Sequence, residues 1–228
     1  MPSKRKSLMF ASASFTSIFS FVIICLVLAT KNWVSSTISF TSGTANMTML
    51  YTYGLFEGHW SATVVHGISI PESSFQVADL LDNGTVKSFN IVVIFLLVLS
   101  LLSSFLSAGF TCYNAVSNPY QTFLGPVGAY TWNSISGICI LFTLILFAVN
   151  VEANELSVQL AFNTSPSPPS RLYKLSNSYG YSYWIMLLIV LLNVATIIII
   201  VFYQKARYSK RKEQERPMES APKDGILF

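Results

Sequence analysis

Four long apolar runs, none of which contains a formal charge, alternate with polar segments along this chain of 228 residues. The longest uncharged stretch extends from Ser88 to Val151 and contains two of these runs, joined by a short turn-rich segment. Apolar runs of about 20 residues have the length that an α-helix needs to cross a bilayer. This stretch therefore predicts two antiparallel transmembrane helices with a short loop between them.

A third run follows the basic residues Lys4–Lys6, and the most apolar run follows Gly180. The first run could instead be a cleaved signal peptide, with Val27-Leu-Ala29 as its cleavage site, but its length favours a retained span. The predicted fold is an all-α four-helix transmembrane bundle with a small extracellular β-rich first loop. We expect transmembrane helices over 8–30, 89–113, 131–150 and 181–203, extracellular loops over 31–88 and 151–180, a cytoplasmic loop over 114–130, and cytoplasmic ends over 1–7 and 204–228.

The charge distribution predicts which ends of the spans face the cytoplasm. Most of the 14 basic residues lie in the two terminal segments: Lys4, Arg5, Lys6, Lys205, Arg207, Lys210, Arg211, Lys212, Arg216 and Lys223. Because cytoplasmic segments carry an excess of Lys and Arg, both ends should be cytoplasmic. The chain is then a multi-pass protein of the secretory pathway, with the plasma membrane as its expected location. Three N-glycosylation sequons fall in the expected extracellular loops, at Asn46, Asn83 and Asn163.

The first large loop has the alternation of polar with β-branched or aromatic residues that is typical of short strands. Its final part has apolar residues at helical spacing instead. The pattern predicts strands over Val34–Phe40, Thr48–Phe56 and Thr63–Ile70, and a short helix over Ser74–Leu81 with Phe75, Ala78 and Leu81 on one face.

Small and hydroxylated residues recur at helical spacing within the first three spans. Helices in lipid gain little from hydrophobicity against one another, so such stripes mark close helix–helix contact. We expect these spans to pack through Ala13, Thr16, Ser17 and Ser20, through Ser100, Ser103, Ser104, Ser107 and Thr111, and through a stripe that begins with Asn133, Ser136 and Gly137.

Few residues are suited to catalysis, and no metal or cofactor site is predicted. The three cysteines lie in apolar runs, so they offer no disulfide framework and no metal-ligand spacing. Glu57, His59 and His66 lie in one loop but lack a further ligand of suitable type. No Gly-x-Ser-x-Gly motif and no ionisable residue within a span is present. Asn193 is the best candidate for a polar function at depth, and an interhelical hydrogen bond is its simpler role.

The basic tail offers two candidate contacts. Lys205, Arg207, Lys210, Arg211 and Lys212 follow the last span directly, where they could bind anionic headgroups or simply anchor the topology. The last three residues, Ile226, Leu227 and Phe228, place apolar side chains beside a free carboxylate, which suits a PDZ-type scaffold. The segment Val201-Phe-Tyr203-Gln-Lys205 also fits a proposed cholesterol pattern that occurs widely by chance.

Several motifs resemble those of one family. They are Tyr53-Gly-Leu-Phe-Glu-Gly58, Cys112-Tyr-Asn-Ala115, Asn118-Pro-Tyr120 with Gly125-Pro-Val-Gly128, Ser182-Tyr-Trp184 and the terminal Asp224-Gly-Ile-Leu-Phe228. In these motifs, and over its whole length, the chain resembles the clarins, small tetraspan membrane proteins.

The resemblance implies a non-enzymatic protein that organises or chaperones other membrane proteins. The expected partners are membrane lipids, other membrane proteins and a PDZ-type cytoplasmic scaffold. No nucleic-acid partner is expected. Self-association stays open as a further mode of assembly. A subunit of a pore or transporter is the alternative function, which the absence of charge at depth disfavours.

Overall fold

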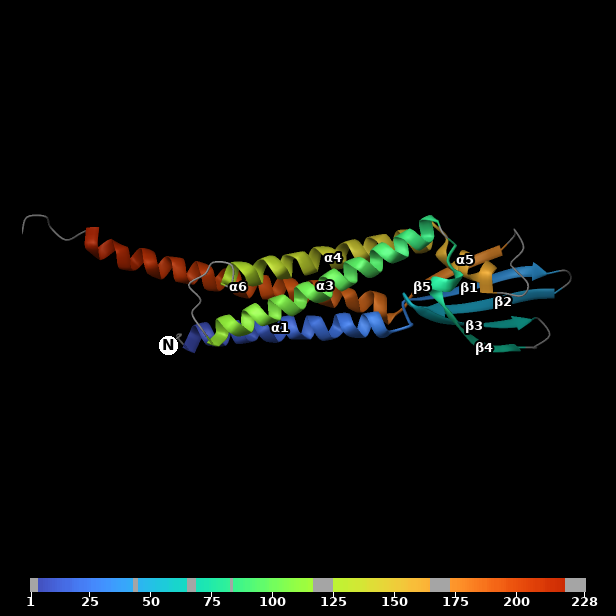
Figure 1. The fold of residues 1–228 in the computed structure, drawn as a ribbon, viewed down its shortest axis with the longest axis horizontal. Coiled ribbons are helices and arrows are strands. Elements are labelled where there is room, and N and C mark those ends of the chain that lie inside the picture. The colour runs from blue at the N-terminus through green and yellow to red at the C-terminus, as the bar shows by residue number, and fades with distance from the viewer. Residues whose placement is uncertain are drawn as a thin grey trace, which may run out of the picture.

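Four long helices run side by side and carry a small sheet at one end (Figure 1). The computed structural model describes residues 4–42, 45–64, 69–82, 84–116, 125–164 and 173–219. Both described ends of the chain lie at the end of the bundle opposite the sheet (Figure 1). The four long helices are α1 (Lys4–Ala29), α3 (Thr85–Val116), α4 (Pro126–Glu152) and α6 (Tyr181–Glu219).

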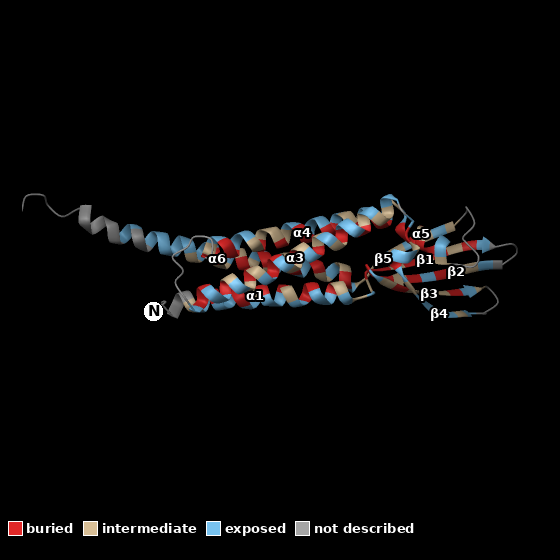
Figure 2. Cartoon of the chain, viewed as in Figure 1, coloured by how far each residue is buried: buried red, intermediate tan, exposed pale blue. Residues whose placement is uncertain are grey.

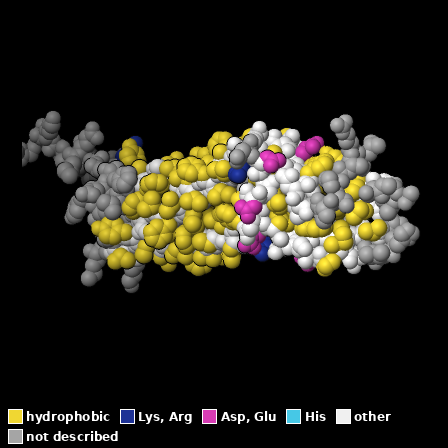
Figure 3. Space-filling model, turned by 45° about the vertical axis from the view of Figure 1, so that its right-hand side comes forward, with side chains coloured by type: hydrophobic (Ala, Val, Ile, Leu, Met, Phe, Trp, Pro, Cys, Tyr) yellow, Lys and Arg dark blue, Asp and Glu magenta, His cyan; other side chains and the backbone are white. Residues whose placement is uncertain are grey.

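The outer surface of the bundle has the character of a membrane-spanning protein. Each long helix contains a segment long and apolar enough to cross a bilayer: Ser7–Ala29, Thr85–Val116, Pro126–Glu152 and Tyr181–Ser209. Large apolar side chains on these segments point outward, such as Phe15 at 71% exposed and Leu191 at 65%. Figure 3 shows a broad apolar surface along the bundle, with charged side chains gathered where the bundle meets the sheet. Water would disfavour so large an apolar surface, whereas lipid accommodates it.

The helices form a ring in which α1 packs on α3 and α6, and α4 packs on the same two helices. Pro126 begins α4, a position where its missing N–H costs no helical hydrogen bond. Buried residues follow the inward side of each helix (Figure 2). Each predicted span lies within a helix, apart from Thr30, and α6 continues beyond the predicted end of the last span to Glu219.

The sheet has five antiparallel strands in the order β4-β3-β2-β1-β5. They are β1 (Val34–Ser42), β2 (Ala45–Tyr53), β3 (Glu57–Val64), β4 (Ser69–Gln76) and β5 (Tyr173–Tyr179). Two short helices accompany the sheet, α2 (Val77–Leu80) and α5 (Leu156–Thr164). One cluster of buried apolar side chains, among them Val27, Trp33, Ile38, Phe147 and Leu156, continues from the bundle into this region. The fold is therefore the predicted four-helix bundle with a small sheet.

Several details of the loop prediction were wrong. The residues at the two ends of the strand predicted over Thr63–Ile70 belong to different strands, because Thr63 of β3 pairs with Ser69 of β4 in antiparallel register. Of the helix predicted over Ser74–Leu81, only Val77–Leu80 is helical.

Strand pairing overrode the local pattern there, since Ser74 pairs with His59 and Gln76 with Glu57. The strand predicted over Thr48–Phe56 begins earlier and ends at Tyr53. The prediction also missed β5, which comes from the second loop and pairs with β1.

Candidate functional site: a polar bundle core joined to a hydroxyl-rich sheet

Polar side chains fill the centre of the bundle. All four helices contribute, and each of these side chains is at most 1% exposed: Ser17, Ser20, Ser100, Ser103, Ser104, Ser107, Thr111, Asn133, Ser136, Thr143, Asn193 and Thr196. Every serine and threonine predicted to pack lies at or beside this core, with Thr16 half-buried at its edge. We call this set the polar core.

Ser136 of α4 is the centre of one hydrogen-bond cluster. Its Oγ lies 2.8 Å from Ser100 Oγ and 3.2 Å from Ser104 Oγ, both on α3. Asn193 of α6 donates from Nδ2 to the same oxygen at 3.1 Å. A serine hydroxyl has one donor and two acceptor positions, so these contacts use its full capacity. This one side chain therefore joins three helices.

A second set of contacts brings in α1. Ser17 Oγ lies 3.2 Å from Ser107 Oγ, and Asn133 donates from Nδ2 to Ser107 as well. Thr16 and Thr196 join α1 to α6 through a hydroxyl contact of 2.6 Å. With the Ser136 cluster, hydrogen bonds now connect all four pairs of neighbouring helices. The described part of the core contains no ionisable side chain other than Cys139, so it offers no charge to a passing ion.

The sheet is fixed to the bundle by a joint of close backbone contacts. Trp33 donates from Nε1 to the Val27 carbonyl of α1 at 2.9 Å, and its ring meets Phe147 of α4 edge-on at 4.8 Å. Two glycines allow the chain segments to touch. A Cβ at Gly54 would lie 2.4 Å from the Thr30 carbonyl oxygen, and one at Gly180 would lie 2.2 Å from the Asn32 carbonyl oxygen. Neither position has room for a larger residue.

A buried hydroxyl network holds α5 against the inner face of the sheet. Ser157 of α5 lies 2.7 Å from Tyr53 Oη and 2.8 Å from Ser36 Oγ. Ser36 also donates to Asn177 of β5 at 2.7 Å. Burial raises the pKa of the Tyr53 hydroxyl, which stays protonated and able to donate. These residues were not predicted from the sequence, although Ser36, the one polar residue at an inward position of Val34–Phe40, was a signal.

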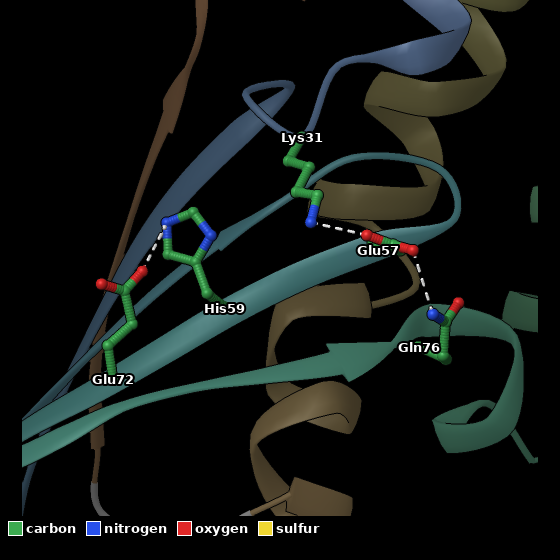
Figure 4. A network of polar contacts seen from close by, with 5 residues as sticks. All are labelled: Lys31, Glu57, His59, Glu72 and Gln76. Carbon is green, nitrogen blue, oxygen red and sulfur yellow. Dashed lines mark hydrogen bonds and ion pairs between the residues drawn. The ribbon is translucent and has the colours of Figure 1, made fainter.

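Three charged residues of the first loop, Lys31, Glu57 and Glu72, take part in two separate contacts (Figure 4). Lys31 Nζ lies 2.6 Å from Glu57, which also accepts a 3.1 Å bond from Gln76. His59 Nε2 lies 3.3 Å from Glu72 on β4. The hydrogen bond and charge of Lys31 hold the pKa of Glu57 below its usual range. No metal-binding group of three His, Cys, Asp or Glu occurs among the described residues, and His66 lies outside them.

The face of the sheet that points away from α5 is rich in hydroxyls. Strand register places Ser176, Thr37, Leu50 and Ser61 in one row across four strands. The row on one side of it contains Ser178, Ser35, Thr52, His59 and Ser74, and the row on its other side contains Lys174, Ser39, Thr48, Thr63 and Ser69. We call these three rows the outer sheet face. Strands β4 and β5, at its two edges, each pair with only one strand among the described residues.

The other predicted site residues are dispersed. Asn46 is exposed on β2, where its Oδ1 accepts a bond from Thr41 at 2.8 Å. Asn163 is exposed on α5 and donates to the Leu80 carbonyl at 2.7 Å. Lys205, Arg207 and Lys212, which were predicted to contact lipid headgroups, are exposed at the far end of α6. Asn83, the side chains of Lys210 and Arg211, and Ile226, Leu227 and Phe228 lie outside the described residues.

Four apolar helices around an uncharged core define a tetraspan, multi-pass membrane protein. A family model described as Clarin-2-like matches residues 5–201. The chain is 48% identical to Clarin-3 of Homo sapiens and 46% identical to Clarin-3 of Mus musculus, over 228 residues and the full length of both chains in each case. It is 28% identical to Clarin-1 of Homo sapiens over 197 residues, which cover 82% of this chain and 83% of that relative. The chain belongs to the clarin family, which confirms the resemblance noted in its sequence.

Proposed function

We propose that this clarin is a non-enzymatic protein that organises or chaperones other membrane proteins, with the outer sheet face as its main contact surface. The joint at Trp33, Gly54 and Gly180 carries this proposal. A sheet fixed to four spans presents its polar face at one height and orientation above the membrane. Fixed presentation lowers the entropy that a partner must lose on binding.

The same proposal places the sheet outside the cell and both chain ends in the cytoplasm, in the plasma membrane. The position of the described ends opposite the sheet supports it, as does the clustering of basic residues there. Glycans at Asn46, Asn83 and Asn163 would then lie on the sheet side. On the cytoplasmic side, the exposed bases of α6 would contact anionic headgroups, and Ile226–Phe228 would engage a PDZ-type scaffold.

The test is quantitative co-purification in mild detergent. Thr37 and Ser61 lie in one row of the outer sheet face, on either side of Leu50, so Thr37→Arg with Ser61→Arg adds charge there without touching the inner core. Gln204→Arg adds charge at an exposed position on the far end of α6 and serves as the control. We expect the double variant to lose membrane-protein partners that the control keeps. An unchanged set of partners would contradict the proposal.

The cytoplasmic contact is tested separately, with a chain that ends at Gly225. This chain lacks only Ile226, Leu227 and Phe228, so we expect it to keep its membrane partners and to lose a scaffold. Recovery of the same scaffold with the shortened chain would remove this part of the proposal, and recovery of copies of the chain alone would favour self-association.

A pore or transporter subunit is the second candidate, since hydroxyls and amides occupy the bundle interior. Their mutual hydrogen bonds favour a closed interior instead. Purified protein in liposomes separates the two functions. Protein-dependent flux that Ser136→Leu abolishes would support the pore.

A further inference from the structure

A narrow slot lies between α4 and α6 on the side of the bundle that faces lipid. Its volume is about 240 Å³. Gly137 and Asn193 meet at its floor, where a Cβ on Gly137 would lie 3.7 Å from Asn193 Cβ. Branched side chains rise on both sides, with Ile138 54%, Leu141 44% and Val194 46% exposed. The floor of the slot is thus formed by Gly137 and Asn193, and its two rims are formed by larger, branched side chains.

Two buried amides that line the slot have an oxygen that receives no hydrogen bond from the described residues. Asn133 and Asn193 are 0% and 1% exposed. Asn133 Nδ2 donates to Ser107 and, at 3.0 Å, to the Ala129 carbonyl oxygen, which can only accept and therefore fixes the orientation of this amide. Asn193 Nδ2 donates to Ser136. Neither Oδ1 atom accepts a hydrogen bond from the described part of the chain. An acceptor without a partner is unfavourable in hydrocarbon, so an occupant that brings a donor would be stabilised here.

The shape of the slot favours a thin occupant over another helix. Transmembrane helices approach closely where small residues form the contact surface. Here Gly137 lies below Ile138 and Leu141, so the rims would hold a neighbouring helix away from the amides. A flat, rigid, apolar body can enter between the rims. A sterol has such a body and carries one hydroxyl donor at one end.

The depth of the slot fits the position of a sterol hydroxyl near the membrane interface. Asn133 lies seven residues after Pro126, where α4 begins, which is about 10 Å at 1.5 Å per residue. On α6, Val194 and Ile197 line the slot, and Lys205 follows on the same side of the helix and is exposed. The amide of Asn133 is thus at the end of the slot nearer the basic tail, and the apolar part extends toward the bilayer centre.

We propose that this slot binds a sterol, with the hydroxyl donating to Asn133 Oδ1 and the ring system lying on Gly137 between Ile138 and Val194. The proposal is independent of the outer sheet face and of any protein partner.

The experiment uses the purified full chain in lipid nanodiscs that contain a photoreactive sterol with a diazirine on its ring system. We expect labelling of residues 134–141 and 190–197. Gly137→Leu fills the floor of the slot and should abolish this labelling. Gly109→Leu is the matched control, because a Cβ at Gly109 of α3 meets nothing within 4 Å. That variant should be labelled like the unmodified chain.

A competition experiment on the unmodified chain tests the hydrogen bond and does not depend on how Gly137→Leu folds. Cholesterol should displace the probe about threefold more effectively than its 3-ketone analogue, which cannot donate, because one intramembrane hydrogen bond contributes about this factor. Equal competition would overturn the hydrogen bond to Asn133, and undiminished labelling of Gly137→Leu would overturn the site. A photocrosslinker at Ile138 that captures a second copy or another membrane protein, with no sterol labelling, would show that a helix covers the slot instead.

Discussion

Ser136→Ala is the sharpest test of the polar core. The substitution removes only one oxygen, yet that oxygen contacts Ser100, Ser104 and Asn193 on two other helices. Interhelical hydrogen bonds in membranes contribute about 0.6 kcal/mol each on average. Three such contacts give an expected loss of about 1.8 kcal/mol in the free energy of unfolding.

Ser134→Ala provides the matched control. Ser134 lies two residues away on α4, is only half-buried, and donates to the Tyr130 carbonyl of its own helix at 3.0 Å. Since its hydroxyl contacts no other helix among the described residues, we expect its loss to change stability by less than about 0.5 kcal/mol. Both variants remove one serine hydroxyl from α4, but only Ser136→Ala removes contacts to other helices.

Both variants can be measured by reversible unfolding in mixed micelles with increasing dodecyl sulfate, followed by far-ultraviolet circular dichroism. The double variant Ser100→Ala with Ser136→Ala should lose less than the sum of the two single variants, because the two hydroxyls share one contact. If Ser136→Ala costs no more than Ser134→Ala, the hydroxyl cluster does not hold the helices together and the reasoning fails.

Three further predictions concern the sheet and its joint. Gly180→Ala should destabilise the protein by about 1–3 kcal/mol in thermal unfolding, because the new Cβ would lie 2.2 Å from a backbone carbonyl oxygen. Gly84→Ala is the control and should be near neutral, since the nearest atom to its Cβ would be 4.0 Å away. Tyr53→Phe should cost about 1 kcal/mol in the same assay by removing the buried bond to α5, and no loss would contradict that role. The lowered pKa of Glu57 means that its bond to Lys31 stabilises the fold above the carboxyl's usual titration range and is lost as pH falls through the lowered pKa. The unfolding temperature of Glu57→Gln should therefore approach that of the unmodified chain on acidification, and a constant difference would argue against the contact.

The bundle could be predicted from sequence because its signals are local. A run of apolar residues without charge has few alternatives to a membrane span, and hydroxyls at helical spacing show which side of a helix meets its neighbours. The spacing of Ser100, Ser104 and Ser107 contained this information. It did not reveal that Ser136 and Asn193 converge, since that depends on how the helices are arranged around the ring.

The sheet was harder to predict because its signals are not local. β5 is a short, polar segment far along the chain, and it becomes a strand by pairing with β1 across at least 133 positions, the separation between Phe40 and Tyr173. Residues Ser74–Gln76 show the reverse effect, where pairing with β3 replaced an apparent helical pattern. The network around Ser157 was missed for the same reason, since α5 meets Tyr53 and Ser36 only in the folded structure.

The proposed function requires the outer sheet face to contact other membrane proteins, and in-cell photocrosslinking measures this contact directly. A photoreactive amino acid at Thr37, in the middle of that face, is compared with one at Ile145 of α4, which is 59% exposed toward lipid. We predict that Thr37 captures a reproducible set of membrane proteins and that Ile145 does not capture this set. The substitution Ser61→Arg, two strands away from Thr37 in the same row, should abolish the capture. Crosslinks from Thr37 that are absent, or that are unchanged by that variant, would contradict the proposed function.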